Sequence, residues 1–145
     1  MSRSSPGRYA LHEFAKNVYE VKAVDSAGKA LVVTRPNEHQ WNVTGHRGYV
    51  RVTYTLYADR ADGTYSGIDN THAHLNMPAT FMFARNTFER PIRVKFNAPA
   101  GSGWKVATQL KPTADPYVFT APNLQYFFDS PTELSNYASP VFFVV

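Results

Sequence analysis

The sequence predicts an all-β fold, a partly open β-sandwich with at most one short helix. Aromatic residues make up 14% of the chain, and aromatic residues are enriched in strands. Short segments with alternating apolar and polar side chains recur, and the ten prolines suit turns and strand edges. With 145 residues, of which 43% are hydrophobic, we expect residues 1–145 to form a single domain with its own core.

The first expected strands lie between residues 18 and 44. VYEVKAV (18–24) and KALVVT (29–34) mix β-branched and polar residues, and the turn sequence DSAG separates them. We expect these two strands to pair with each other, and we expect Pro36 to end the second one. HQWNVT (39–44) is the third expected strand, closed by GHRG.

The clearest alternation in the chain follows, in YVRVTYTLYA (49–58). Successive side chains of a strand point to opposite faces of the sheet. The apolar side chains that share one face are Val50, Val52, Tyr54 and Leu56. The pattern therefore predicts a strand with that face buried.

The second half of the chain repeats these signals. PIRVKFN (91–97) alternates again, and WKVATQL (104–110) and YVFTA (117–121) are further expected strands. NLQYFFDSP (123–131) follows Pro122 and ends at a proline, which favours one short helix there.

Composition and charge exclude several classes of function. The net charge is +4, but Lys and Arg are scattered singly, so we expect no nucleic-acid partner. The chain has no cysteine, which excludes disulfides and cysteine-ligated metal. No apolar run approaches the ~20 residues of a membrane-spanning helix, so we expect no membrane partner.

The strongest candidate for chemistry is THAHLNMPATFMF (71–83). On a strand, His72 and His74 would point the same way, and with nearby Asp69 they are weak candidates for a zinc site. The alternative is that they hold a loop or sheet edge in place through hydrogen bonds. His12-Glu13 begins like the His-Glu-x-x-His motif, but Lys16 replaces its last histidine. We identify no self-sufficient active site, which favours a module that supports or binds.

Four long segments together are similar to one known family. They resemble the N-terminal domain of the glycyl-aminopeptidases, bacterial zinc metallopeptidases of the thermolysin clan that carry a PDZ domain. The resemblance extends from about Ser5 to Asn136. The segments are SPGRYALHEFAKNV (5–18), DGTYSGIDNTHAHLNMPATFMFAR (62–85), GWKVATQL (103–110) and APNLQYFFDSPTEL (121–134).

The resemblance implies that this chain is a fragment of a larger peptidase. In the family, a β-sandwich precedes the catalytic domain, which holds the zinc motif, and the PDZ module follows. The chain would then be non-catalytic and without a cofactor, with zinc belonging to the parent enzyme. It would pack on the catalytic domain and shape the cleft for a peptide substrate. The resemblance makes His72, His74 and Asn76 candidates for lining that cleft or docking the catalytic domain.

The chain departs from the family at both ends. Family members have one or two strands before the motif that is Pro6-Gly7-Arg8-Tyr9 here, and residues 129–145 are interpreted as an exit segment and tail. Missing strands would leave an open sheet edge, so we expect self-association through it, unless the apolar VFFVV tail fills the place.

A second class of function stays open, an independent module that binds carbohydrate or peptide. It rests on aromatic side chains that form stacking platforms when exposed and fill the core when buried. The candidate platforms are Trp41, Tyr54, Tyr57, Tyr65 and Trp104.

Overall fold

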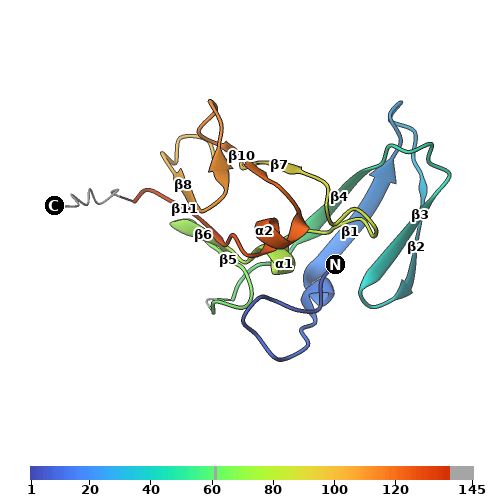
Figure 1. Cartoon of the computed structure of the whole chain (residues 1–145), viewed down its shortest axis with the longest axis horizontal. Coiled ribbons are helices and arrows are strands. Elements are labelled where there is room, and N and C mark those ends of the chain that lie inside the picture. The colour runs from blue at the N-terminus through green and yellow to red at the C-terminus, as the bar shows by residue number, and fades with distance from the viewer. Residues whose placement is uncertain (61, 138–145) are drawn as a thin grey trace.

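The computed structural model describes residues 1–60 and 62–137, and strands dominate it (Figure 1). No helix among these residues is long and apolar enough to cross a membrane. The helical elements are the 3-10 turn η1 (Phe14–Asn17), α1 (Met77–Thr80) and α2 (Leu124–Phe128). The strands are β1 (Val18–Val24), β2 (Val32–Asn37), β3 (Gln40–Thr44), β4 (Arg51–Leu56), β5 (Gly67–Ile68), β6 (His72–Leu75), β7 (Ile92–Lys95), β8 (Lys105–Thr108), β9 (Lys111–Pro112), β10 (Val118–Ala121) and β11 (Thr132–Ser135).

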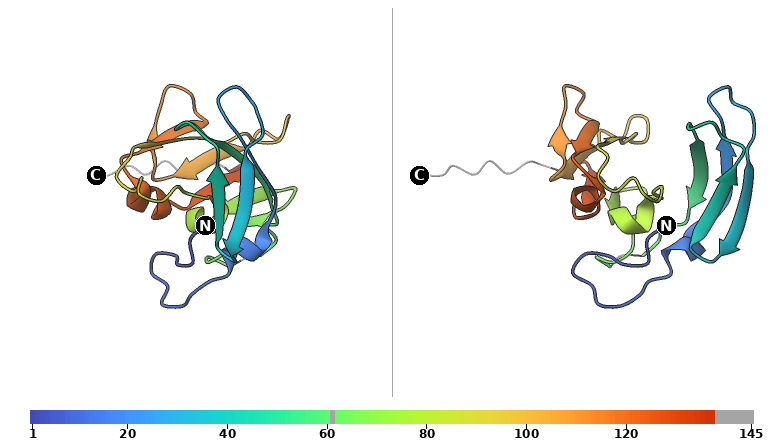
Figure 2. Two further views of the ribbon diagram at one scale, coloured as in Figure 1. Left: turned by 90° about the vertical axis from the view of Figure 1, so that its right-hand side faces the viewer. Right: turned by 45° about the vertical axis from the view of Figure 1, so that its right-hand side comes forward.

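The strands form two regions, which Figure 2 shows side by side. The N-terminal region consists of the antiparallel pairs β1–β4 and β2–β3, joined where Val24 forms a bridge with Ala30. The C-terminal region contains the sheet β5-β6-β11-β8 and the sheet β7-β10-β9. The main hydrophobic core lies entirely in the C-terminal region. Its largest side chains are Trp104, Phe96, Phe119, Phe127 and Met77.

The all-β prediction is confirmed, and most expected strands lie where the alternation placed them. The strands β1, β3, β4, β7, β8 and β10 each fall inside a predicted segment. In β7 the apolar Val94 is buried, whereas Arg93 and Lys95 are exposed. The two-residue period therefore located strands correctly in both regions.

For the second strand, the predicted pairing with β1 is confirmed only at the bridge between Val24 and Ala30, and the prediction that Pro36 ends the strand was wrong. Its residues begin at Val32 and continue through Pro36 to Asn37. The pairing register with β3 shifts between Thr34 and Asn37, so the proline lies at an irregularity, where its missing N–H breaks no ladder bond. The main partner of β1 is β4, not the second strand, which touches β1 only around the bridge from Val24.

The expected short helix is confirmed as α2, and the structure adds a second helical turn, α1, beyond the single helix predicted. Asn123 caps α2, since its side chain accepts a hydrogen bond from the Tyr126 amide at 2.9 Å. In α1, Pro78 stands in the first turn, where the helix needs no donor from its amide. A turn of four residues is too short for a helical period to appear in the sequence.

The prediction of a buried face on β4 was also wrong. Val52 is 37% exposed, and Val50, Tyr54 and Leu56 are only partly buried. The face lines a groove, described below, and no second layer covers it among the described residues. The sequence of β4 therefore alternates as predicted, but its apolar face is not buried as the alternation indicated.

The segment 129–145, interpreted as an exit, contains the strand β11. This strand lies between β6 and β8, so that Thr132–Ser135 is an integral part of the sheet. Residues 138–145, including the VFFVV tail, lie outside the described residues.

Candidate functional site

His72 and His74 point to the same side of β6, as their spacing predicts. Both are partly buried, whereas the intervening Ala73 and the following Leu75 are buried in the core. The strand is not at an edge, because β5 pairs with it on one side and β11 on the other. Pairing with β11 therefore sets the face of the sheet on which both histidines stand, and β5 adds a partner opposite His74.

Asp69 closes the turn that leads into β6. Its Oδ1 atom accepts hydrogen bonds from the Thr71 amide at 2.7 Å, the Thr71 hydroxyl at 2.7 Å and the His72 amide at 3.0 Å. The hydroxyl and the two amides stabilise the carboxylate form and lower the pKa of Asp69 from 3.8 to about 2. The Nδ1 atom of His72 also lies 3.2 Å from the same oxygen.

His74 has a different carboxylate partner. Its Nδ1 atom lies 3.3 Å from Oε2 of Glu133, the residue directly opposite it on β11. The two side chains are 35% and 36% exposed, so the pair is accessible to a partner while its geometry is set by the sheet. Nothing in the local sequence around His74 indicates Glu133, because only the pairing of β6 with β11 brings them together.

The two histidines open onto a small hollow of about 330 Å³. Among the described residues that line it, the charged groups are mainly carboxylates. The one arginine among them, Arg60, is engaged at 2.8 Å with Asp62 and stacks over the Tyr65 ring at 4.2 Å. Hydrogen bonds from the Tyr65 and Thr64 amides lower the pKa of Asp62, with Arg60 adding to the effect. The carboxylates that line the hollow are Asp59, Asp62, Asp69 and Glu133.

The structure does not bring Asp69, His72 and His74 together as a metal-binding group. Across residues 1–60 and 62–137, no three His, Asp or Glu side chains are arranged to hold an ion. Each imidazole instead faces its own carboxylate, as the distances above show. Within the described part of the chain, the arrangement of Asp69, His72 and His74 therefore does not fit zinc, which takes at least three protein ligands.

Asn76 lies apart from this hollow and is only 6% exposed. Its side-chain amide donates to the Ser5 hydroxyl at 3.0 Å and to the Thr64 carbonyl. Its backbone carbonyl accepts from the Thr80 hydroxyl at 2.9 Å. Asn76 thus joins the N-terminal segment, the loop before β5 and α1, and these bonds hold β6 in position.

The five aromatic side chains considered as platforms divide into two groups. Trp104 and Tyr65 are buried, at 6% and 8% exposure. Trp41 and Tyr54 line the larger groove between the two regions, and Tyr57 is exposed with its hydroxyl 3.2 Å from Asp59.

The fold and the comparisons with known proteins define the class, the N-terminal domain of a peptidase. The family described as the Peptidase M61 N-terminal domain matches residues 1–136. The chain belongs to this family, which confirms the resemblance seen in the sequence.

One solved structure of similar fold is described as an aminopeptidase N family protein from Idiomarina loihiensis. It superimposes with a TM-score of 0.87 at 22% sequence identity, over 94% of this chain and 24% of the other. The chain therefore spans about a quarter of the length of that protein, and at this identity the likeness concerns the fold. No curated protein matches the chain.

Proposed function

We propose that this N-terminal domain packs on the catalytic domain of a zinc metallo-aminopeptidase and that the β6 face helps to shape the cleft for the peptide substrate. Zinc would be held by the catalytic domain. The observation that supports the proposal is the position of His72, His74 and Glu133, on the side of a sheet whose other side packs on the core.

Charge supports a role near the amino end of a peptide. The described residues that line the hollow beside His74 include four carboxylates and one arginine, and that arginine is paired. On a chain with a net charge of +4, such a hollow attracts a cationic group. A peptide that is cleaved from its amino end presents an ammonium group, which is complementary to this surface.

The reading frame beyond Val145 gives the first test. We expect it to encode a helix with the His-Glu-x-x-His motif, and a frame without such a motif would overturn the proposal. The isolated chain supplied with zinc should show no peptidase turnover.

The second test uses the longer protein that this frame encodes. His74→Ala and Glu133→Ala should raise KM for a peptide substrate by about tenfold, or about 1.4 kcal/mol, because the side chains contact the substrate or position the cleft wall. Glu89→Ala, an exposed carboxylate outside both the hollow and the larger groove, is the matched control and should leave KM unchanged. Equal KM values for all three variants would contradict a role for this face.

A further inference from the structure

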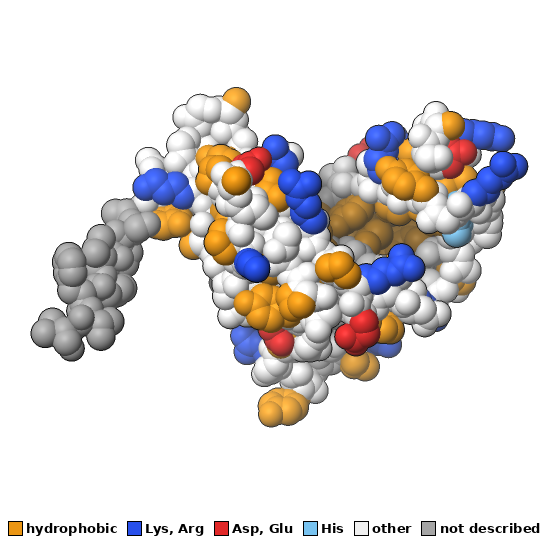
Figure 3. All heavy atoms as spheres, turned by 45° about the horizontal axis from the view of Figure 1, so that its top comes forward, with side chains coloured by type: hydrophobic (Ala, Val, Ile, Leu, Met, Phe, Trp, Pro, Cys, Tyr) orange, Lys and Arg blue, Asp and Glu red, His pale blue; other side chains and the backbone are white. Residues whose placement is uncertain are grey.

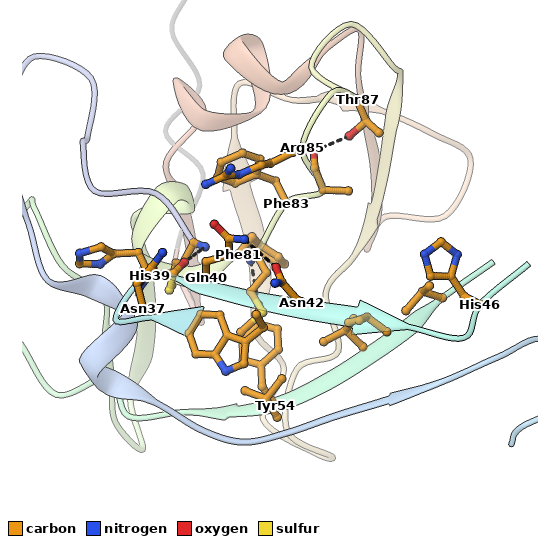
Figure 4. A pocket seen from close by; sticks show the side chains of 18 of the residues that line it. Asn37, His39, Gln40, Asn42, His46, Tyr54, Phe81, Phe83, Arg85 and Thr87 are labelled. Carbon is orange, nitrogen blue, oxygen red and sulfur yellow. Dashed lines mark hydrogen bonds between the residues drawn. The ribbon is translucent and has the colours of Figure 1, made fainter. Parts of the chain in front are cut away.

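A large groove of about 1550 Å³ separates the two regions of the molecule (Figures 3 and 4). One wall is the apolar face of β4 with Val52 and Tyr54, and the opposite wall includes Phe81 and Phe83. Figure 3 shows hydrophobic atoms at the bottom of this hollow and Lys or Arg side chains around it. Small-molecule sites have volumes of about 300–1,000 Å³, so the groove has the size for a polypeptide segment.

The groove follows the edge of β3. Every residue from 37 to 44 lines it, including Trp41 and Val43 from one face and Gln40 and Asn42 from the other. Neighbouring side chains of a strand point to opposite faces, so a groove that meets all of them passes along the strand edge. Among the described strands β3 pairs only with β2, which leaves its other edge open for main-chain hydrogen bonds.

Two polar groups of His39 lie next to this edge, a carbonyl that accepts a hydrogen bond and a ring nitrogen that has no hydrogen-bond partner among the described residues. The Met1 ammonium donates to the carbonyl of His39 at 2.8 Å, directly before β3. The Nδ1 atom of His39 is buried and has no hydrogen-bond partner in the described part of the chain. The main chain at this end of the groove therefore already accepts a hydrogen bond from a donor outside the β2–β3 hairpin.

The charges around the groove have one dominant sign. Arg3, Arg85 and Arg90 line it, and Glu38 is the one carboxylate among the described residues that do so. Figure 4 shows Arg85 and Phe83 on one side of the groove, across from Asn42 and Tyr54. An occupant that brings carboxylates to these guanidinium groups and apolar side chains to the walls is complementary to the groove.

We propose that this groove binds an extended strand of a different protein, acidic and with apolar side chains at alternate positions, which pairs with the open edge of β3. Main-chain hydrogen bonds to β3 would supply affinity, and alternate side chains would fill the apolar walls, as in other cases of strand addition. The site is distinct from the β6 face and does not depend on the proposed peptidase role.

The probe for this proposal is a fluorescein-labelled synthetic peptide of alternating Glu and Val, measured by fluorescence anisotropy. We expect saturable binding to the intact chain, about tenfold tighter than that of the alternating Lys and Val peptide. N-methylation of every second residue tests the strand pairing, because alternate amides of an extended peptide face opposite edges. Methylation in one register should abolish binding and methylation in the other should leave it nearly unchanged. Equal effects of both registers would overturn pairing with β3.

Variants of the chain locate the site. Val52→Glu places a carboxylate on the groove wall, whereas Thr53→Glu places the same charge on the opposite face of β4. Arg85→Glu and Arg51→Glu form a second matched pair, inside and outside the groove. We expect the two groove variants to lose at least about tenfold in affinity and the two controls to bind normally.

Both groove positions are at the surface, and thermal unfolding of each variant verifies that it is folded. Four variants with equal affinity, or no binding by the original chain, would overturn the proposal. Sedimentation velocity tests whether a second copy of this chain occupies the groove instead. A dimer that Val52→Glu converts to a monomer would show that a second copy fills the groove, and would also overturn it.

Discussion

The two regions of this domain use the same sequence pattern with different results. In the N-terminal region, Val52 stands on the apolar face of β4 and is 37% exposed. In the C-terminal region, Val94 stands on the apolar face of β7 and is 8% exposed. Both are valines in strands with alternating apolar and polar side chains, so the alternation itself does not decide burial.

The difference lies in what each face meets. The sheet with β7 and the sheet with β6 enclose a shared core, into which α2 also places Phe127. Among the residues of the four strands in the N-terminal region, only Val18 and Ala23 are buried. Alternation indicates which face of a strand needs a partner, and the tertiary arrangement determines whether the described chain provides one.

The largest expected effect is in the core of the C-terminal region. Phe127 is 4% exposed, and its ring packs edge-to-face on Phe81 at 5.2 Å. Phe127→Ala should lower the free energy of unfolding by about 3–5 kcal/mol, through lost burial and a cavity. Phe88, at 46% exposure, is the control, and Phe88→Ala should cost about 0.5 kcal/mol. Urea denaturation with unchanged m-values measures both, and equal losses would show that the core is not where the structure places it.

A polar core position should show the next largest effect. Asn76→Ala leaves the Ser5 hydroxyl and the Thr64 carbonyl without their buried partner, which should cost about 2 kcal/mol. Asn42→Ala in the N-terminal region removes the same amide from an exposed position. The same denaturation experiment compares them, and a smaller loss for Asn76 than for Asn42 would contradict its role in joining three segments.

The two valines give the most direct comparison between the regions. Val94→Ala removes two buried methyl groups and should cost about 1.5 kcal/mol, whereas Val52→Ala should cost about 0.5 kcal/mol. If an alternating Glu and Val peptide occupies the groove, its presence should increase the loss caused by Val52→Ala and leave that of Val94→Ala unchanged. If Val52→Ala lowers the free energy of unfolding as much as Val94→Ala does in the absence of peptide, the face of β4 is covered.

The smallest expected effect concerns pH. The pKa of Asp69 is lowered from 3.8 to about 2 by the Thr71 hydroxyl and the Thr71 and His72 amides. Because the folded pKa is the lower one, the stabilisation is present above pH 3.8 and is lost as the pH falls towards 2. Carboxyl NMR titration should show Asp69 ionised at pH 3, and Asp69→Asn should remove this part of the acid dependence. A midpoint near the ordinary value would contradict the turn geometry around Thr71.

The sequence predicted the strands better than their partners. Local alternation located β4 and β7, and two flanking prolines located α2, because these signals lie within a few residues of one another. The strand β11 was missed, since Thr132–Ser135 contains one apolar residue, Leu134, and owes its place to pairing with β6 and β8. The same holds for the site. The spacing of His72 and His74 predicted that they share a face, whereas only the pairing of β6 with β11 shows that Glu133 lies beside His74.

By itself, the sequence determined the β-class of this domain, the common side of its two histidines and the family to which it belongs, because these depend on neighbouring residues and on long continuous motifs. Only the tertiary structure decided that His74 faces Glu133, that Asn76 is a buried junction and that the face of β4 opens onto a groove. These contacts join residues far apart in the chain. Their geometry depends on how sheets pair and pack, which no local pattern specifies.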